Sequence, residues 1–380
     1  MPTCIGLMSG TSLDGVDGVI ADFDPATLRP VCLRGHAHAA MPQPLAEELL
    51  ALNRSGDDEL HRAALAANAL MQLYAEVVVR LLAGAGLAPR EVLALGAHGQ
   101  TVRHRPLDFD GIGYSLQLVN GALLAERTGI ATVCDFRSAD LAAGGQGAPL
   151  VPAFHAACFA QPGQDVAILN LGGIANLTLL SAAGDVRGFD VGPGNVLMDL
   201  WSRRCSGRSY DAEGALAAAG RILPELLAVW LAEPYFRLEP PKSTGRDLFH
   251  AGWLEQGLHR ARRTTAGAAG AADVMATLAE LTAVTVADAV RSRLPAARRV
   301  RVCGGGAFNR HLMARLRARL PGLALESTAA EGIAPDQVEA LAFAWLAACR
   351  MAGRSASLPA VTGARAPRVL GALYAAPTCP

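Results

Sequence analysis

Two segments of the chain share one pattern, in which an apolar run enters a turn of glycine and polar residues and a second apolar run leaves it. The first is residues 4–24, CIGLMSGTSLDGVDGVIADFD, and the second, about 160 residues later, is residues 166–180, VAILNLGGIANLTLL. Each segment predicts a strand, a turn and a second strand. The repeat indicates two related α/β domains with a cleft between them, or two unrelated β-turn-β units, which are common.

The rest of the chain alternates predicted strands and helices, as an α/β protein does. Short apolar runs at 91–97 and 129–134 predict buried strands, the segment 184–190 predicts a short strand that ends at an acid, and the segment 300–309 begins with a strand. Helices are predicted within 44–89, from Val196, after the glycines at 304–306, and at 335–350. Residues 142–152, AAGGQGAPLVP, read as a Gly/Pro hinge, and we expect the chain to cross between the two domains there.

Charge and cysteine spacing exclude several classes of protein. The chain has 34 basic and 34 acidic residues, so its net charge is zero, whereas nucleic-acid-binding proteins usually have a basic excess. No apolar run of about 18 residues predicts a membrane span, and Met1–Cys4 has no basic segment typical of a secretory signal. The eight cysteines are scattered, without the close spacing of a zinc or dithiol site. We expect a soluble cytoplasmic protein that binds neither nucleic acid nor membrane.

Lysine is nearly absent from the chain. Of the 34 basic residues 33 are arginine, and Lys242 in PPKSTGRD is the one lysine. A P-loop requires GxxxxGK[ST], which this context does not match, and a protein kinase requires a lysine on a strand. Lys242 has two interpretations that the sequence leaves open: a compact positive charge directed at a phosphate or hydroxyl, or chance retention in a surface loop.

The first glycine turn has the composition of a phosphate-binding loop. Successive backbone N–H groups around Ser9–Gly15 can form a concavity for phosphate oxygens, and Thr11 and Ser12 add hydroxyl donors. Asp14 could hold a magnesium ion through water. The alternative is a tight hairpin capped by serine and aspartate.

Two further glycine segments fit a nucleotide site. In the second turn, Gly172 and Gly173 permit close backbone approach and Asn170 and Asn176 can donate or accept hydrogen bonds, although a bulged hairpin explains the same residues. Three consecutive glycines at 304–306 follow an apolar strand and precede a helix, where a base or ribose could lie on bare backbone. They do not form the GxGxxG of a dinucleotide-binding fold.

Polar residues at predicted strand ends are candidates for catalysis and substrate binding. Asp190 ends the strand of GFDVGPGN, where a general base would be placed, or else it caps the following turn. His98, Gln100 and Arg137 follow two strands of the first half and would face a cleft if those strands are parallel. His36 and His38 lack further metal ligands nearby, so we predict no metal site there.

Taken in order, the segments GLMSGTSLDGVD, GAHGQTVRH, DFR, AAGGQGAPLVPAFH, NLGGIANLT, GFDVGPGNVLMD, PKSTGRDLF and CGGGAFN resemble the anhydro-N-acetylmuramic acid kinase family across residues 4 to about 374. The resemblance implies two ribonuclease H-like domains of the hexokinase, Hsp70 and actin superfamily flanking a central active-site cleft. We expect residues 1–150 and 352–380 in the first domain and residues 151–351 in the second.

The resemblance also implies a reaction of peptidoglycan recycling. ATP phosphorylates O6 of 1,6-anhydro-N-acetylmuramic acid while water opens the anhydro bond at C1, giving N-acetylmuramic acid 6-phosphate and ADP. The family's catalytic aspartate falls on Asp190, which would act as the base for that water. The partners would be the sugar and ATP with Mg²⁺, whose protein ligands the sequence leaves unknown, and the protein would be a homodimer.

The resemblance also implies which residues bind the nucleotide and which bind the sugar. The first phosphate loop falls on Ser9, Gly10, Thr11, Ser12, Leu13, Asp14, Gly15, Val16 and Asp17. By analogy with the superfamily, the second phosphate loop includes Asn170, Gly172, Gly173 and Asn176, and the adenosine contacts Gly304, Gly305, Gly306 and Asn309. For the sugar we expect His98, Gln100, Arg137 and Glu339, with Arg137 on the lactyl carboxylate.

Two alternatives remain at this point. One is an ordinary sugar or carboxylate kinase of the same superfamily, which phosphorylates a free hydroxyl without opening a ring. The other is a nucleotide-dependent assembly module of the actin or Hsp70 type, which would bind ATP without sugar-stimulated turnover.

Overall fold

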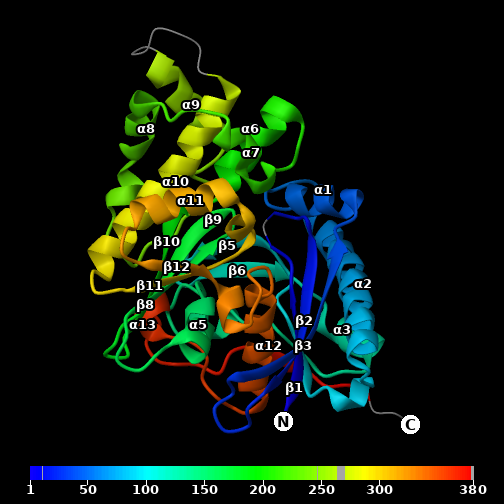
Figure 1. The fold of residues 1–380 in the computed structure, drawn as a ribbon. Coiled ribbons are helices and arrows are strands. Elements are labelled where there is room, and N and C mark those ends of the chain that lie inside the picture. The colour runs from blue at the N-terminus through cyan, green and yellow to red at the C-terminus, as the bar shows by residue number, and fades with distance from the viewer. Residues whose placement is uncertain (11, 246, 263–269, 378–380) are drawn as a thin grey trace. The chain divides into compact units, whose positions relative to one another are not determined.

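The computed structural model describes residues 1–10, 12–245, 247–262 and 270–377, which form two compact units (Figure 1). Unit 1 comprises Met1–Cys158 and Gln337–Pro380, and unit 2 comprises Phe159–Asp336. Thr11, a predicted phosphate-loop residue, lies outside the described residues.

Unit 1 is built on a six-stranded sheet with the order β13-β7-β4-β1-β2-β3. Its strands are β1 (Thr3–Met8), β2 (Gly15–Phe23), β3 (Pro30–Ala40), β4 (Ala94–Ala97), β7 (Thr132–Cys134) and β13 (Ala372–Tyr374), and β5 (Gln100–Pro106) pairs separately with β6 (Gly113–Leu118). The helices are α1 (Gln43–Ala51), α2 (Glu59–Ala85), α3 (Gly121–Thr128), α4 (Ser138–Ala142), α5 (Val151–Phe159), α12 (Val338–Met351) and α13 (Pro359–Thr362), with a 3₁₀ turn at Pro89–Glu91.

Helices α2 and α12 cover opposite faces of this sheet (Figure 1). On β2, a Cβ added at Gly18 would meet Val77 of α2, and Gly18 pairs with Leu7 of β1. The neighbouring residue of β1, Gly6, faces the other way and contacts the backbone of α12. This alternation is the period of two expected for a strand, and it explains why every residue of β1 and β2 except Met8 and Asp17 is buried.

Two glycines let α12 lie directly on the sheet. Gly6 of β1 and Gly96 of β4 are partners in the parallel register. A Cβ at Gly6 would be 1.8 Å from the carbonyl oxygen of Ala340, and one at Gly96 would be 2.0 Å from that of Phe343. No side chain fits in such a contact, so these glycines fix the position of α12.

Unit 2 is built on a five-stranded sheet with the order β10-β9-β8-β11-β12. Its strands are β8 (Val166–Leu171), β9 (Ile174–Leu180), β10 (Val186–Pro193), β11 (Arg299–Cys303) and β12 (Ala324–Ser327). Its helices are α6 (Val196–Ser206), α7 (Ala215–Ala218), α8 (Pro224–Leu231), α9 (Ala251–Arg262), α10 (Ala271–Arg293) and α11 (Arg310–Arg319), with 3₁₀ turns η2 (Ala212–Gly214), η3 (Pro234–Arg237), η4 (Gly305–Phe308) and η5 (Thr328–Glu331).

The two units share one topology. In each, three antiparallel strands in chain order are followed by two parallel ones, giving β3-β2-β1-β4-β7 in unit 1 and β10-β9-β8-β11-β12 in unit 2. This is the ribonuclease H-like arrangement, so the predicted α/β fold class is confirmed. The matching turns at Ser9–Gly15 and Asn170–Asn176 therefore occupy equivalent places, between the first two strands of each sheet.

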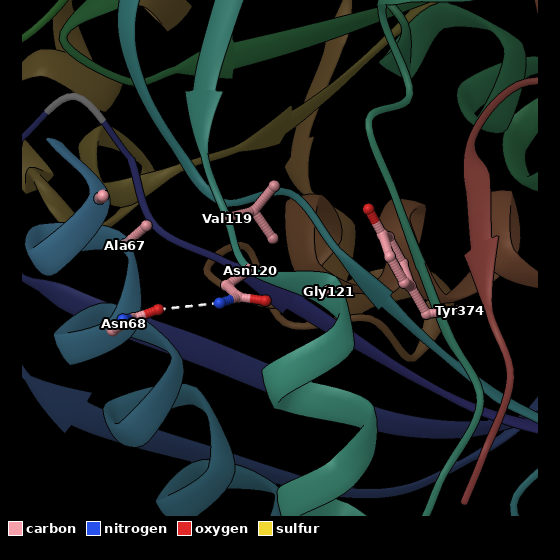
Figure 2. A pocket seen from close by; sticks show the side chains of 7 residues that line it. Ala67, Asn68, Val119, Asn120, Gly121 and Tyr374 are labelled. Carbon is pink, nitrogen blue, oxygen red and sulfur yellow. Dashed lines mark hydrogen bonds between the residues drawn. The ribbon is translucent and has the colours of Figure 1, made fainter. Parts of the chain in front are cut away.

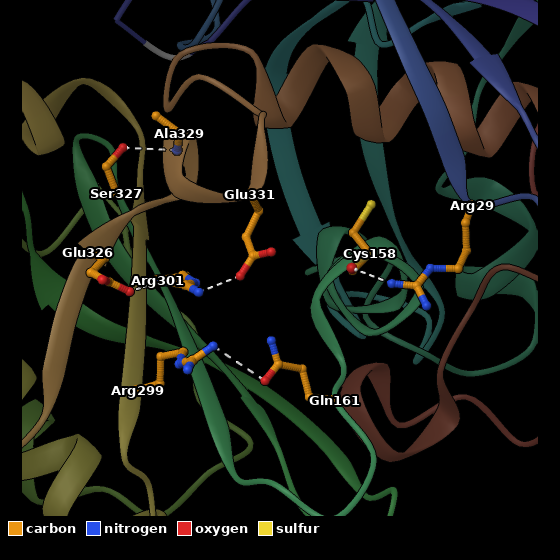
Figure 3. A network of polar contacts seen from close by, with 9 residues as sticks. All are labelled: Arg29, Cys158, Gln161, Arg299, Arg301, Glu326, Ser327, Ala329 and Glu331. Atoms are coloured by element: carbon orange, nitrogen blue, oxygen red, sulfur yellow. Dashed lines mark hydrogen bonds and ion pairs between the residues drawn. The ribbon is translucent and has the colours of Figure 1, made fainter.

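The division between the units differs from the predicted one at residues 150/151 and 351/352. Helix α12 packs against β1, β2 and β4 and therefore belongs to unit 1. Residues 151–158 of α5 also belong there, and the Cys158 carbonyl accepts a hydrogen bond from Arg29 at 2.9 Å (Figure 3). The Gly/Pro segment at 142–149 lies inside unit 1, with Gln146 N–H bonded to the carbonyl of Thr362, so the expectation of a crossing there was wrong.

Charged side chains inside unit 2 are paired. Arg301 of β11 is 5% exposed and forms ion pairs with Glu326 of β12 and Glu331 of η5 (Figure 3). Glu280 of α10 is fully buried, and Arg315 and Arg319 of α11 each donate to it at 2.6 Å. Burial opposes the charge on Glu280, but the two guanidinium groups hold its pKa below the usual value. These contacts join the parallel strands and the α10–α11 pair.

By length and composition alone, helix α2 is long and apolar enough to cross a membrane. This differs from the expectation that the chain has no apolar run of that length. Of the most apolar 18-residue stretch of this helix, 56% is buried. Leu70, Tyr74 and Val77 are fully buried in the core that α2 forms with the sheet of unit 1. The helix therefore has the burial of a core helix.

Substituting Gly6 tests the close approach of α12. In Gly6→Val the new side chain would collide with the helix backbone. We expect the free energy of unfolding, measured by urea denaturation, to fall by about 3 kcal/mol or more. Gly35→Ala in β3 is the control, because its Cβ would make an ordinary 3.4 Å contact with Ile20. Equal urea midpoints for both variants would contradict the proposed packing.

Candidate active site

The first glycine turn links β1 to β2. It lies at the same end of unit 1 as the polar residues that follow the predicted strands. Ser9 is buried, and its hydroxyl donates to the Gly99 carbonyl at 3.0 Å and lies 2.9 Å from the Tyr74 hydroxyl. Leu13 N–H bonds to the carbonyl of Gly10 at 3.2 Å, and Leu13 has a φ of 58°. A left-handed leucine is strained, as residues in ligand-binding turns often are.

The rest of the predicted first phosphate loop divides between turn and strand. Asp14 is exposed, and its carboxylate accepts from the Ser12 hydroxyl at 2.8 Å. Gly15, Val16 and Asp17 already belong to β2. Val16 is fully buried in the core, and the Asp17 carboxylate lies 2.9 Å from His38 Nδ1 on β3. Three of the nine predicted loop residues therefore lie in the sheet.

Three predicted sugar-site residues of unit 1 gather around this turn. The Gln100 amide donates to the Gly10 carbonyl at 3.2 Å. Arg137 lies 2.8 Å from His98 Nε2 and donates to the Gly147 carbonyl at 2.8 Å. Burial, and then the charge of Arg137, lower the pKa of His98 to about 3, so His98 is neutral and accepts from the guanidinium.

Helix α12 brings the fourth predicted residue, Glu339, to the same place. Burial lowers the pKa of Arg137 to about 10, and the charge of Glu339 partly offsets this. Phe343, one turn further along α12, lies 4.7 Å from the His98 ring between centroids. The contact of α12 with Gly6 and Gly96 therefore also positions the residues that surround Arg137.

Three buried polar atoms of this cluster have no hydrogen-bond partner among the described residues. They are Nδ1 of His98, Nε of Arg137 and Oε1 of Gln100. Buried polar atoms are nearly always bonded to protein, water or a ligand. An N–H donor and an amide acceptor beside the turn are the groups that a polar ligand with a carboxylate and hydroxyls would use.

In unit 2 the sheet register aligns the other predicted residues. Asn170 of β8 pairs with Asn176 of β9, and Asn176 pairs with Asp190 of β10. Residues directly opposite each other across a sheet share a face, so the three form one row. A β-bulge lies between Asp190 and Gly192. Strand β10 continues past its predicted end at Asp190 to Pro193. Bulges are common beside active sites, where they redirect side chains.

The turn between β8 and β9 is held by the loop that follows β10. The carbonyls of Gly172 and Gly173 accept from the backbone N–H groups of Asn195 and Gly194, each at 2.9 Å. The Asn195 side chain donates to the carbonyl of Leu171 at 2.9 Å. Strand β10 and this turn are therefore fixed relative to one another.

The three glycines after β11 differ in their surroundings. Gly304 has a φ of 79°, and a Cβ there would lie 2.3 Å from Asn170 Oδ1. A Cβ at Gly306 would lie 2.6 Å from Leu171 Cβ, whereas one at Gly305 would have nothing within 4 Å. Two of these glycines thus permit contact with the β8–β9 turn, and the third is exposed. Asn309 caps α11, where its side chain accepts from Leu312 N–H at 2.9 Å.

Asp190 is held by a loop that sequence reasoning did not connect to it. Its backbone N–H donates to the carbonyl of Lys242 at 3.1 Å, and its own carbonyl accepts from the Tyr235 hydroxyl at 2.8 Å. Its carboxylate oxygen Oδ2 accepts from Thr244 N–H at 3.0 Å. The one lysine of the chain was the signal for this loop, but nothing in the sequence linked it to Asp190.

The surroundings of Asp190 suit a proton acceptor. Burial raises the pKa of Asp190 to about 6, although the Thr244 N–H and the charge of Lys242 both lower it. A carboxyl group with a pKa near 6 is ionised at neutral pH and is a stronger base than an ordinary aspartate.

A separate small pocket in unit 1 lies beside the start of α3 and is lined by Ala64, Ala67, Asn68, Val119, Asn120, Gly121 and Tyr374 (Figure 2). Its main polar groups bind each other. The Asn120 amide donates to Asn68 Oδ1 at 2.8 Å, and Asn120 Oδ1 caps α3 by accepting from Leu123 N–H. None of the predicted site residues lines this pocket, and its polar groups are explained by helix capping.

Comparison with known proteins identifies close relatives over the full length. A family model described as anhydro-N-acetylmuramic acid kinase matches residues 2–376. A protein of that name from Variovorax paradoxus is 57% identical over 378 residues, which cover 98% of both chains. Another from Bordetella pertussis is 56% identical over 98% of this chain and 96% of its own.

Solved structures with a similar fold are more distant. The activator of 2-hydroxyisocaproyl-CoA dehydratase from Clostridium difficile, with bound ADPNP, has a TM-score of 0.46 and 12% identity, covering 92% of this chain and 96% of its own. A ROK family glucokinase from Streptomyces griseus, in complex with glucose and AMPPNP, has a TM-score of 0.39 and 16% identity, covering 90% and 98%.

The glycines after β11 provide a matched test of this site's geometry. Gly304→Ala would place a methyl group against Asn170 in a left-handed conformation, and we expect a loss of stability of about 2 kcal/mol or more. Gly305→Ala points into open space and should change stability by less than about 0.5 kcal/mol. Urea unfolding followed by tryptophan fluorescence measures both. Similar midpoints would show that Gly304 does not contact the β8–β9 turn.

Proposed function

We infer the roles of these residues from one premise: the chain belongs to the anhydro-N-acetylmuramic acid kinase family. It is therefore an ATP-dependent phosphotransferase with an alcohol acceptor, in cell-wall recycling. It hydrolyses the 1,6-anhydro bond of 1,6-anhydro-N-acetylmuramic acid and phosphorylates O6. The ordinary sugar kinase and the actin-like or Hsp70-like module are set aside, because the family match covers nearly the whole chain.

Between heavy atoms the reaction forms two bonds and breaks two, and one proton moves from water to a base. The oxygen of a water molecule bonds to C1 as the C1–O6 bond breaks, and O6 bonds to the γ-phosphorus as the bond to the leaving ADP breaks. One proton of the water must be removed. Glycosidic hydrolysis usually requires a second carboxyl group to protonate the leaving oxygen, but here that oxygen attacks phosphorus, so a single base is sufficient.

We assign the base to Asp190. The observation that carries this assignment is its environment: a carboxylate with a pKa raised to about 6 by burial, with Oδ2 already bonded to the Thr244 N–H. This leaves Oδ1 as the oxygen that would take the proton. Asp190 also lies in one row with Asn170 and Asn176 of the predicted second phosphate loop, as a base acting near a transferred phosphoryl group must.

The cluster of unit 1 is proposed to bind the sugar. The lactyl group of the substrate carries a carboxylate, and Arg137 offers a partly buried guanidinium whose buried Nε has no partner among the described residues. Neutral His98 orients Arg137 without competing for the anion. Gln100 would accept from a hydroxyl or amide of the sugar through Oε1, and Glu339 would balance the charge of Arg137.

ATP is proposed to bind through the three glycine segments. The turns at Ser9–Asp14 and Asn170–Asn176 would hold the phosphates, since backbone N–H groups in such turns bind anions. The glycines at 304–306 would lie against the adenosine, with Gly305 as the bare surface. The capping role of Asn309 makes its contribution indirect, because it fixes the start of α11.

Magnesium fits this donor set only as part of the nucleotide complex. Within the described residues no group of three or more His, Cys, Asp or Glu side chains could hold a metal ion. Magnesium in phosphoryl-transfer sites is usually bound by phosphate oxygens, waters and one or two carboxylates. The exposed Asp14 at the first turn is the carboxylate that would contact it, directly or through water, and the ion would neutralise phosphate charge.

We also propose that the protein is cytoplasmic and forms a homodimer. Its substrate ATP and its free cysteines, which the described residues include on both units, fit a reducing compartment that supplies ATP. The dimer rests on the family resemblance alone.

Replacing the base tests the assignment directly. Asp190→Asn keeps an oxygen that can accept from Thr244 but cannot take a proton, so we expect kcat to fall by about 10²–10⁴ with nucleotide affinity retained. Asp185→Asn, exposed on the same hairpin, is the control. For the unmodified protein, kcat/KM should fall as the pH drops below about 6, because Asp190 becomes protonated. An Asp190→Asn enzyme with a near-normal rate would end this assignment.

Replacing Arg137 tests the sugar site. Arg137→Ala removes the proposed partner of the lactyl carboxylate, and a lost charged pair corresponds to about 10- to 100-fold in affinity. We expect the KM for the sugar to rise by that factor while the KM for ATP stays constant. Arg127→Ala, an exposed arginine at the end of α3, is the control. Unchanged sugar KM in Arg137→Ala would remove Arg137 from the site.

A further inference from the structure

The only lysine of the chain lies beside the proposed base and contacts it through its backbone. The carbonyl of Lys242 accepts from the N–H of Asp190, so a backbone hydrogen bond joins the two segments. Two residues later, Thr244 N–H donates to the Asp190 carboxylate. The segment 242–244 therefore fixes both the backbone and the side chain of Asp190.

The ammonium group of Lys242 is directed at the 3₁₀ turn η3 instead of at Asp190 itself. Its Nζ donates to the carbonyl of Tyr235 at 3.2 Å and lies 3.5 Å from that of Phe236. The same atom lies 4.7 Å above the centre of the Tyr235 ring. Three weak attractions of one cation, to two carbonyl dipoles and a π-face, hold this side chain in one place.

The turn that the ammonium binds contacts Asp190 in its own right. The Tyr235 hydroxyl donates to the Asp190 carbonyl at 2.8 Å. Tyr235 is buried, and its ring packs edge-on against Phe249 at 5.9 Å. Lys242 therefore connects the two segments that hold Asp190. Its backbone belongs to the segment 242–244, and its side chain binds η3.

We propose that Lys242 is a positioning residue for the reaction, which joins η3 to the segment 242–244 and so holds Asp190 in the orientation in which it accepts the proton. The proposal rests on the role of Asp190 given above. It explains why this position has a lysine in a chain that otherwise uses arginine. An ammonium is compact and has three donors that can turn toward neighbouring carbonyls, whereas a guanidinium is planar, longer and fixed in its donor directions.

The charge of Lys242 has a second consequence for Asp190. A positive charge nearby favours the ionised carboxylate, and it opposes the effect of burial on the pKa of Asp190. Among the described residues, the other charged groups that shift the pKa of Lys242 are Arg293 and Glu239, which form an ion pair with each other. Of the described charges, Lys242 is the one that lowers the pKa of Asp190.

The test compares Lys242→Met, Lys242→Arg and Tyr235→Phe with the unmodified protein, using anhydro sugar and Mg-ATP over a range of pH. Lys242→Met removes the charge and the link to η3. We expect kcat to fall by about 10- to 100-fold with both KM values little changed, and the acid limb of kcat/KM to move up by about 0.5–1 pH unit. Arg237→Met, which removes an exposed arginine from the same turn, should change neither.

The other two variants separate charge from geometry and guard against misfolding. Lys242→Arg keeps the charge, so its acid limb should stay near that of the unmodified protein while kcat is only partly restored. Tyr235→Phe loses one hydroxyl and no charge, and we expect a lower kcat with an unmoved acid limb. Circular dichroism and urea midpoints establish that each variant is folded.

The outcomes distinguish this proposal from the assignment of the base. If Asp190→Asn turns over normally, the assignment fails and the role of Lys242 fails with it. If Asp190→Asn is inactive but Lys242→Met has the kcat and acid limb of the unmodified protein, only the positioning role is overturned. A rise in sugar or ATP KM without loss of kcat in Lys242→Met would also overturn it, because it would make Lys242 a binding residue.

Discussion

The backbone of α12 lies directly on β1 and β4, and this contact is possible only because residues 6 and 96 are both glycine. A helix this close to a sheet has little freedom to slide or rotate, since the carbonyls of Ala340 and Phe343 fill the space where side chains would stand. Glu339 and Phe343 are thereby placed beside Arg137 and His98. The charge balance of the partly buried Arg137 guanidinium depends on that placement, so the packing of the core and the electrostatics of the proposed sugar site have one origin.

In unit 2, hydrogen bonds hold the proposed base in place. The proposed base, Asp190, must keep its carboxylate partly buried, so that its pKa rises, without losing its orientation. Here the backbone of Asp190 is bonded on both sides, to Lys242 and to Tyr235, and one carboxylate oxygen is bonded to Thr244. The segments that do this lie about 45–55 residues further along the chain, and the register of β8, β9 and β10 aligns Asp190 with the asparagines of the neighbouring turn.

The sequence predicted what is local and missed what depends on distant contacts. The two β-turn-β patterns predicted the strands on either side of both turns, because alternation and glycine turns are encoded within a few residues. The family motifs indicated Asp190, and sheet register then aligned it with Asn176. The unit boundaries were misplaced, since nothing in the apolar run at 335–350 states that it packs on a strand more than 300 residues earlier. The function of Lys242 was likewise left open, because its contacts to Asp190 and Tyr235 exist only in the folded chain.

The central claim is that ring opening by water and phosphoryl transfer to O6 occur in one reaction. Mass spectrometry of the product tests it most directly, after incubation with 1,6-anhydro-N-acetylmuramic acid and Mg-ATP in ¹⁸O-labelled water. We predict a product with one added phosphoryl group and one ¹⁸O atom, located at C1. A phosphorylated product that lacks ¹⁸O at C1, or phosphorylation of a plain sugar with no reaction of the anhydro sugar, would contradict this account.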